Sequence, residues 1–444
     1  MKKQITDLSG TQGFKAAVLI VLTLIMLIPI SMVKSLIFER SHRAYQVREE
    51  IADTAGGRLK FAGPVIRIPG TRELERSYVD TDGKKAREIY EQEFVIWMPA
   101  DKLEVRAALD TENKFRGIFN GSIFTGEIEL TGLFDFSELE SELEDNESIA
   151  ADKAEIVIPF FNQRGIRSIT RAVWNGGKVS LNSGKRVLGF DSAGVWAPAP
   201  FDSSAKTVDF NFAFSVRGAG SVSILPLAGE SLISMGADWA SPSFSGFCLP
   251  DEHSIGDSGF TAEWSFSSLS SGLPMKWSGK DVFEYRRLED AFITTDFISI
   301  HDHYEQNERA AKYAVLFILL PFITLFLFEH FFSCRLHFVQ YILAGIANVI
   351  FYLLLLSLSE HLSFNLSYLI SALSVSLMLC LYTFSILRKN RKAWFMAPVM
   401  AAVYLFLFVT LQSEDWALLI GAGGVFAVTA VIMFITRNID FYKN

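Results

Sequence analysis

Six long apolar segments, each close to the length that crosses a lipid bilayer, are the feature that most constrains this sequence. A spanning helix needs about 20 mostly apolar residues to cross roughly 30 Å of hydrocarbon. One segment lies near the N-terminus, and five follow one another in the last third of the chain. We therefore predict six transmembrane helices, at residues 14–37, 313–332, 338–359, 362–387, 393–411 and 416–436.

The first apolar segment could instead be a cleaved signal peptide, because Lys2 and Lys3 precede it. Its apolar run is longer than the roughly 7–15 residues of a signal-peptide core. It also contains no pair of small residues at the spacing that signal peptidase cleaves. The sequence therefore predicts a retained membrane anchor.

Lys and Arg in the short loops predict the orientation of the helices, because these residues are retained on the cytoplasmic side. With the N-terminus inside, the cytoplasmic loops and the C-terminal tail carry Arg335, Arg388, Lys389, Arg391, Lys392, Arg437 and Lys443. The two short loops on the other side contain no Lys or Arg, and they carry Glu360, His361, Glu414 and Asp415. We predict that residues 1–13 and 437–444 are cytoplasmic and that residues 38–312 form a domain on the far side of the membrane.

The predicted external domain is acidic. Residues 38–312 contain 30 Lys and Arg against 43 Asp and Glu, a net charge of −13, whereas the whole chain carries −8. Binding of phosphate groups needs clustered Lys and Arg. We therefore expect no nucleic-acid partner for this domain, and the lipid bilayer is the partner of the helices.

The three cysteines are predicted to lie in different compartments: Cys248 outside, Cys334 in a cytoplasmic loop and Cys380 within the fourth span. With only one thiol on the outer side, no intrachain disulfide can form there. A hydrophobic core must therefore hold the external domain together. Cys248 is most simply a small buried core residue, with an intermolecular bridge or a reactive thiol as the alternatives.

The external domain has the pattern of a β protein. The segment 208–216 places Val208, Phe210, Phe212, Phe214 and Val216 on one face, with polar or small residues on the other. Turn residues separate several apolar runs, because Asn and Gly tolerate the positive φ of a tight turn. The predicted turns are Asp82-Gly83, Asn120-Gly121, Asn175-Gly176 and Asn182-Ser183-Gly184. We predict a six-span α-helical membrane protein with a large all-β or β-rich antiparallel sandwich domain.

Helix is expected only at the two ends of this domain. Residues 39–54 and 299–312 are rich in charge, lack Gly and Pro, and run into the first and second spans as helical stems. The acidic segment 138–152 is predicted to be a solvated loop or a short surface helix. It lacks the Gly and the ligand spacing of a calcium loop.

The sequence contains no convincing catalytic constellation, so we predict a protein that is not an enzyme, with no cofactor and no metal. His301, Asp302 and His303 could offer metal ligands, but no second Cys or His group follows at a recognised spacing. The Gly-x-Ser-x-Gly motif of many hydrolases is absent.

Charges at the ends of the spans are the remaining candidates for function. On the cytoplasmic side, Glu329 is close in sequence to Arg335 and His337, and an ion pair there would reduce the cost of burying Glu329. On the outer side, one set of residues is either an interdomain or cation contact or a group of ordinary loop charges that end helices. These residues are Glu360, His361, Glu414 and Asp415.

Several of these segments resemble the CreD family of bacterial inner membrane proteins. The matching motifs include residues 351–361, 414–419 and 436–442, with Trp239-Ala240-Ser241-Pro242-Ser243-Phe244 and Gly259-Phe260-Thr261-Ala262-Glu263-Trp264 in the external domain and Glu39-Arg40 after the first span. One departure is His337-Phe338, where the family has His-Pro, so that a helix-initiating Pro is lost.

The resemblance implies a cell-envelope integrity factor of the cytoplasmic membrane in a Gram-negative-type cell, with residues 38–312 in the periplasm. It also implies a link to responses to β-lactams and envelope stress, under a two-component regulatory system. No chemical activity comes with the resemblance.

Two hypotheses therefore remain. In the first, the periplasmic domain binds an unidentified protein or envelope component while the helices anchor it and relay the event. In the second, the protein is an intramembrane transporter or enzyme that uses Glu329, Glu360 and His361. The first is favoured, because four of the spans contain no internal ionisable residue, whereas transporters place polar groups or broken helices near the midplane.

Overall fold

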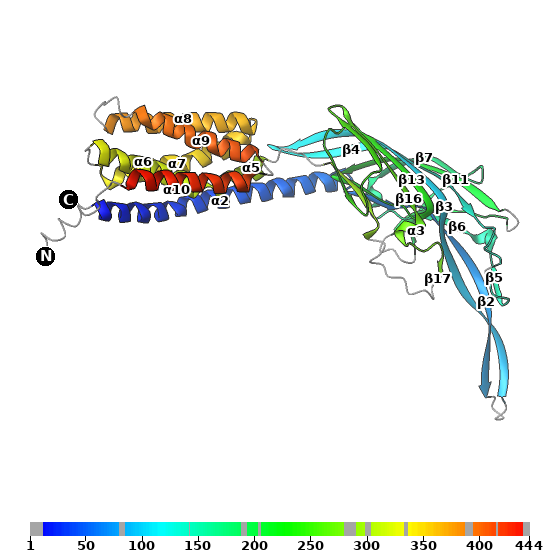
Figure 1. Ribbon diagram of the computed structural model, residues 1–444. Coiled ribbons are helices and arrows are strands. Elements are labelled where there is room, and N and C mark those ends of the chain that lie inside the picture. The colour runs from blue at the N-terminus through cyan, green and yellow to red at the C-terminus, as the bar shows by residue number, and fades with distance from the viewer. Residues whose placement is uncertain are drawn as a thin grey trace. The chain divides into compact units, whose positions relative to one another are not determined.

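The chain forms two compact units, one helical and one β-rich (Figure 1). The helical unit comprises Met1–Tyr45 and His301–Asn444, and the β-rich unit comprises Gln46–Ile300. The computed structural model describes residues 12–79, 85–141, 143–187, 193–202, 206–278, 290–297, 303–332, 336–386, 394–413 and 416–437.

Seven helices belong wholly or partly to the helical unit as far as the structure describes it. They are α2 (Gln12–Ala55), α5 (His303–Lys312), α6 (Ala314–Phe332), α7 (Phe338–Ser359), α8 (Phe364–Ile386), α9 (Met396–Gln412) and α10 (Ala417–Thr436). Helix α2 is 44 residues long. Its first part is the predicted first span, and its charged second part confirms the helical stem expected at 39–54.

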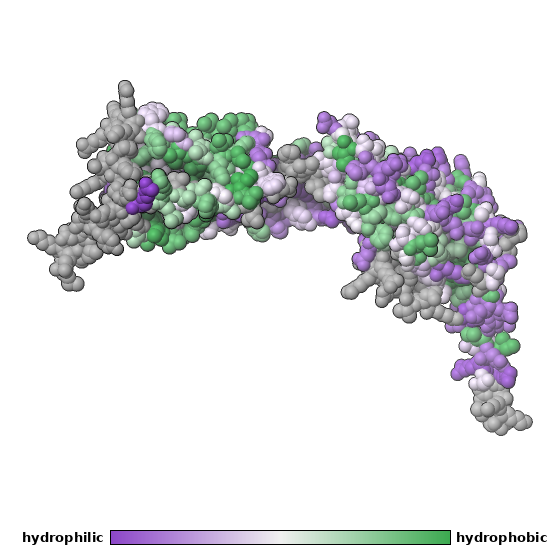
Figure 2. Space-filling view, viewed as in Figure 1, coloured by the Kyte–Doolittle hydropathy of each residue, from purple (hydrophilic) through white to green (hydrophobic). Residues whose placement is uncertain are grey.

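Length and composition qualify three helices, among the described residues, as candidate membrane spans. These are Ala17–Ala55, Phe338–Ser359 and Phe364–Ile386, and the bent pair His303–Lys312 with Phe317–Glu329 would make a fourth. Helix α9 is apolar but has only 17 residues. The structure thus contains an N-terminal apolar helix and two further candidate spans, and the count of six stays a prediction. Hydrophobic residues dominate the visible face of the helical unit (Figure 2), as contact with lipid requires.

Small residues allow the helices to pack closely. A Cβ atom at Gly345 of α7 would lie 2.8 Å from Phe322 of α6 and 2.9 Å from Met26 of α2, so only a glycine fits there without displacement of its neighbours. Nearby, the Tyr368 hydroxyl of α8 donates a hydrogen bond to the Tyr404 carbonyl oxygen of α9 at 2.6 Å. Because lipid tails are as apolar as the helix surfaces, the hydrophobic effect does not drive helices together in a membrane. Interhelical hydrogen bonds of this kind therefore supplement van der Waals packing.

The described strands of the β-rich unit form two sheets. The larger has fourteen strands, with the path β8-β7-β11-β4-β3-β2-β6-β10-β9, and the smaller has the order β1-β12-β18-β14. The strands are β1 (Leu59–Ala62), β2 (Val65–Val79), β3 (Lys85–Arg116), β4 (Phe119–Asp135), β5 (Glu147–Ile149), β6 (Glu155–Ile158), β7 (Ile166–Trp174), β8 (Gly177–Lys178), β9 (Asn182–Arg186), β10 (Ala193–Pro198), β11 (Thr207–Ala219), β12 (Ser221–Leu225), β13 (Ala228–Ala237), β14 (Pro242–Gly246), β15 (Glu252–Gly256), β16 (Gly259–Ser267), β17 (Trp277–Ser278) and β18 (Ile293–Phe297). Short helical turns η1 (Ala151–Lys153), η2 (Gln163–Gly165) and α3 (Ser268–Ser271) connect some of them.

The β-rich character predicted from the sequence is confirmed, with one difference in strand direction. Most strand pairs are antiparallel, but β1 pairs with β12 and β13 pairs with β3 in parallel. Parallel pairing needs long connections between its strands, and alternation within one strand carries no information about the direction of its neighbour.

Strand β11 confirms the predicted buried face. Val208, Phe210, Phe212, Phe214 and Val216 are all at most 2% exposed. The strand pairs with β4 along its whole length and with β7 on its other side. These side chains join one large core cluster that includes residues from both sheets.

The predicted turns had different outcomes. Asn175-Gly176 is a tight turn with φ of 49° and 70°, as predicted. Asn120-Gly121 is not a turn, because both residues lie within β4 opposite Phe115 and Lys114. The turn falls three residues earlier, at Gly117 with φ of 66°.

The remaining local predictions also need correction or lie outside the described residues. Asn182-Ser183-Gly184 lies in strand β9 next to an irregularity in its pairing with β10. The acidic segment 138–152 contains a short strand, β5, which pairs with β2. Asp82-Gly83 lies outside the described residues, and so does the first part of the stem predicted at 299–312.

Candidate functional site

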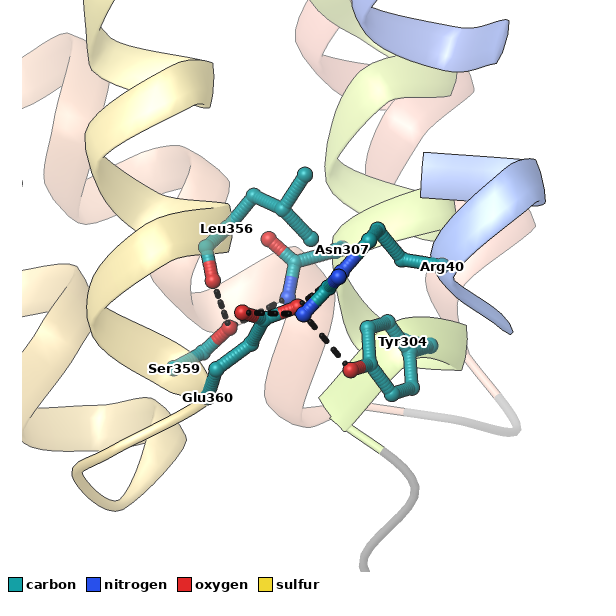
Figure 3. Close-up of polar contacts among 6 residues, drawn as sticks. All are labelled: Arg40, Tyr304, Asn307, Leu356, Ser359 and Glu360. Atoms are coloured by element: carbon teal, nitrogen blue, oxygen red, sulfur yellow. Dashed lines mark hydrogen bonds and ion pairs between the residues drawn. The ribbon is translucent and has the colours of Figure 1, made fainter. Parts of the chain in front are cut away.

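Three helices of the helical unit meet at the carboxylate of Glu360 (Figure 3). Glu360 is the residue that ends α7, so its side chain is placed by the last turn of that helix. Arg40 of α2 donates two hydrogen bonds to it, from Nε to Oε1 at 2.7 Å and from Nη2 to Oε2 at 2.9 Å. The hydroxyl of Tyr304 in α5 donates a third, to Oε1 at 3.0 Å.

The pairing of Arg40 with Glu360 is bidentate and largely shielded. The Glu360 side chain is 11% exposed and the Arg40 side chain is 33% exposed. Two parallel bonds between a guanidinium and a carboxylate combine charge attraction with a fixed geometry. Arg40 and Tyr304 lie outside the predicted spans 14–37 and 313–332. The hydrogen bond to Glu360 raises the pKa of Arg40, and burial followed by the Glu360 bond raises the pKa of Tyr304.

A second polar contact lies next to the Arg40–Glu360 pair. It involves Ser359, the residue before Glu360 in α7. The amide Nδ2 of Asn307 donates to Ser359 Oγ at 2.8 Å and to the His303 carbonyl oxygen at 2.6 Å. The Ser359 hydroxyl donates in turn to the Leu356 carbonyl oxygen at 2.9 Å. Asn307 and Ser359 are each 1% exposed, so these bonds are protected from competition with water.

We name Arg40, Tyr304, Asn307, Ser359 and Glu360 the Glu360 cluster. The cluster fastens α2 and α5 to α7 at one end of the helical unit. Helix α2 leads along the chain into the β-rich unit, and α5 is the first described helix after that unit. The cluster therefore joins the two chain segments that connect the units.

The other residues predicted for the outer site are placed differently. His361 is exposed in the turn after α7, where its backbone N–H donates to the Leu358 carbonyl oxygen at 3.0 Å. Glu414 and Asp415 lie outside the described residues. The structure thus brings Glu360 together with Arg40 and Tyr304, and it places the His361 side chain in solvent.

Two residues of the predicted cytoplasmic-side cluster, Glu329 and His337, form hydrogen bonds at the connection between α6 and α7. The Glu329 carboxylate accepts hydrogen bonds from the Leu336 N–H at 3.2 Å and from the Tyr341 hydroxyl at 3.1 Å. His337 caps α7: its Nδ1 accepts from the Val339 N–H, and its own N–H donates to Gln340 Oε1. Arg335 lies outside the described residues.

This capping box explains how α7 begins at Phe338 without a proline at its first position. A helix start leaves N–H groups without partners, and reciprocal bonds between the N-cap and N3 residues satisfy two of them. His337 and Gln340 supply both bonds here.

The described residues contain no group of three or more His, Cys, Asp or Glu side chains that could hold a metal ion. His301 and Asp302 lie outside the described part, and the His303 ring lies 5.2 Å from that of Tyr304. Cys248 is half-buried against the core of the β-rich unit, and burial raises the pKa of its thiol. Cys380 is half-buried in α8, and Cys334 lies outside the described residues.

Sequence reasoning identified Glu360 but not its partners. Arg40 and Ser359 enter the prediction only as parts of family motifs, and Tyr304 and Asn307 do not enter it. Two signals could have found them. Arg40 is a basic residue just beyond an apolar span, and Tyr304 and Asn307 lie three residues apart, on one face of a stem helix.

Apolar helices of spanning length, joined by chain to a large β-rich unit, define an integral membrane protein with an extramembrane domain. A family described as "Inner membrane protein CreD" matches residues 11–442. The chain is also 33% identical over 426 residues to the inner membrane protein CreD of Escherichia coli (strain K12), a match that covers 94% of this chain and 91% of that protein. The chain therefore belongs to the CreD family of inner membrane proteins, as its motifs indicated.

Proposed function

We propose that this protein is a non-enzymatic cell-envelope integrity factor, acting in envelope stress and the response to β-lactams through a periplasmic binding domain. The β-rich unit binds a protein or another envelope component, and α2 and α5 carry the consequence to the membrane helices. The observation that supports this proposal is the Glu360 cluster. The Glu360 carboxylate bonds both connecting helices, so a displacement of either α2 or α5 changes the contacts of the same residue at the end of α7.

The topology that this function needs is six spans, both termini in the cytoplasm and residues 38–312 in the periplasm. The asymmetry of Lys and Arg in the short loops supports the orientation. Helices α6, α9 and α10 have 19, 17 and 20 residues, close to the length of a span.

The alternative is a transporter or enzyme that uses Glu329, Glu360 and His361. In the structure the Glu329 and Glu360 carboxylates are engaged by neighbouring donors, and His361 is exposed. The cavity of about 840 Å³ between α8 and α9 is lined mainly by apolar side chains, among them Leu369, Leu373 and Phe408. A transport path for a polar solute needs polar groups near the membrane midplane, so the structural role of these residues is better supported.

Complementation tests the proposal. In a strain that lacks the gene, the wild-type protein should restore tolerance to β-lactams and detergents. Arg40→Gln and Glu360→Gln should restore less at equal abundance, and the exposed neighbour His361→Gln is the matched control. Full restoration by the first two variants would contradict the proposal. Loss of tolerance with an unchanged connection between the helices, measured by protease protection, would favour the alternative.

A further inference from the structure

Strands β2 and β3 continue as a two-stranded ribbon beyond the other strands of the β-rich unit (Figure 1). The last described neighbours of β2 are β5, at Gly70–Arg72, and Asn146, which bonds the backbone of Glu73. On β3, the described partners other than β2 begin at Ile96, opposite Ser278. We name residues 73–79 and 85–93 the arm. Within the described residues, each arm strand pairs only with the other, so the outer edge of β3 has no described partner before Ile96, and we call this stretch its open edge.

An open edge of this length exposes unpaired N–H and C=O groups, which is a template for pairing with another strand. An isolated two-stranded ribbon is also only marginally stable in water. The arm nevertheless carries large apolar side chains in solvent: Ile89 is 70% exposed and Tyr90 is 44% exposed. A further strand along the edge of β3 would pair these backbone groups and cover part of both side chains.

On one face of the arm, acidic side chains lie near the base and a basic side chain lies near the tip. The register places Glu73 opposite Glu91 near the base and Ser77 opposite Arg87 near the tip. Like charges directly opposite each other destabilise a strand pair. Arg87 lies 3.1 Å from Glu75, a contact in which both side chains are more than half exposed. Glu91 therefore has a like charge as its cross-strand neighbour.

The charges of β3 in the arm are arranged so that two antiparallel copies of this strand place opposite charges across from each other. If two copies of β3 lie antiparallel with a two-fold axis at Ile89, each Arg87 faces the other copy's Glu91 and the two Ile89 side chains face each other. Glu88 then faces Tyr90, and the sequence continues the pattern with Lys85 opposite Glu93. Moving the axis by one residue removes the match, because Glu88 would face Glu88 or Ile89 would face Glu91.

We propose that the open edge of β3 pairs with the same edge of a second copy of this chain, in antiparallel register about Ile89. The pairing forms a four-stranded sheet with the order β2-β3-β3-β2 and an isologous two-fold interface, in which residue i contacts j and j contacts i. A contact of one strand edge per copy is small beside the roughly 1,200–2,000 Å² that stable complexes bury. The two copies therefore associate weakly in dilute solution, and their confinement to one membrane supports the contact.

Disulfide crosslinking in membranes tests the register. The full-length protein with Cys248, Cys334 and Cys380 changed to Ser carries one new cysteine, and mild oxidation is followed by measurement of covalent dimer. Ile89→Cys should crosslink efficiently, because residues directly opposite lie about 4.5–5.5 Å apart, within disulfide range. Glu75→Cys is the matched control: it is exposed on the same face, but three strand spacings, about 14 Å, separate the two copies.

Two further experiments test the two-fold symmetry and the charges. Co-expressed Arg87→Cys and Glu91→Cys chains with different tags should crosslink to each other more than either does to itself. In the Ile89→Cys background, Arg87→Glu should reduce the dimer roughly tenfold, because two attractive pairs become repulsive. The exchange Arg87→Glu with Glu91→Arg should restore it. Equal crosslinking at positions 75 and 89, no crosslinking at 89, or a dimer that is indifferent to the charge reversal would overturn the proposal.

Discussion

Glu360→Gln should loosen the end of the helical unit where α2, α5 and α7 meet. The glutamine keeps one carbonyl oxygen for Tyr304 but loses the charge and the second bond to Arg40. Breaking a fully buried ion pair costs about 3–5 kcal/mol, and a hydrogen bond to a charged group contributes about 1.5–3 kcal/mol. Because a third of the Arg40 side chain reaches solvent, the cost here is about 1–2 kcal/mol.

That free energy corresponds to a roughly 5–30-fold larger population in which α2 or α5 is detached. Trypsin cleavage of the purified full-length protein after Arg43 and Arg309 measures this population, because cleavage tracks the open fraction when closing is fast. His361→Gln, an exposed neighbour, should cleave like the wild type. A double-mutant cycle with Arg40→Gln should show non-additive effects, since the two residues act as one contact. Cleavage of Glu360→Gln within twofold of the wild type would refute the reasoning.

Three other predictions concern topology, strand packing and pH. Cysteines at positions 250 and 361 should be labelled from outside intact cells and one at 390 only after permeabilisation; labelling of 390 from outside would contradict the orientation. Gly132→Ala should lower the free energy of unfolding by about 1–3 kcal/mol, because its Cβ would lie 2.0 Å from the Lys102 carbonyl oxygen; Gly256→Ala, with open space around it, should be neutral in the same denaturation experiment. Burial raises the pKa of Asp101, so the wild type loses stability as the pH rises from the pKa of the unfolded chain, near 4, through the raised pKa of the folded protein. Asp101→Asn should be more stable than the wild type above that pH range and equally stable below it. A stabilisation by Asp101→Asn that persists at low pH would contradict burial as the cause.

Features that depend on neighbours in the chain could be predicted from the sequence. The buried face of β11 follows from alternation within nine residues, and the turn at Asn175-Gly176 follows from the φ values those two residues tolerate. Asn120-Gly121 carries the same local signal, yet it lies within β4. There the pairing of β4 with both β3 and β11 fixes the register, and Gly117 supplies the positive φ instead.

The candidate site could be predicted only in part for the same reason. A charged residue that ends an apolar helix is visible in the sequence, and Glu360 is such a residue. Its partner Arg40 is 320 residues away, and no periodicity or spacing relates two positions at that separation. Only the folding of the helices shows that the charge has a counterion.

The separation of Arg40 from Glu360 also fixes an order of events during synthesis. Arg40 leaves the ribosome with the first apolar helix, and Glu360 is added only after 320 further residues. At 5–20 residues per second, this interval is on the order of tens of seconds. During this interval the ribosome synthesises the whole β-rich unit, and Arg40 has no Glu360 carboxylate to bind. The bundle therefore closes around the two connecting helices as a late step, and a chain that stops before α7 ends can never complete it.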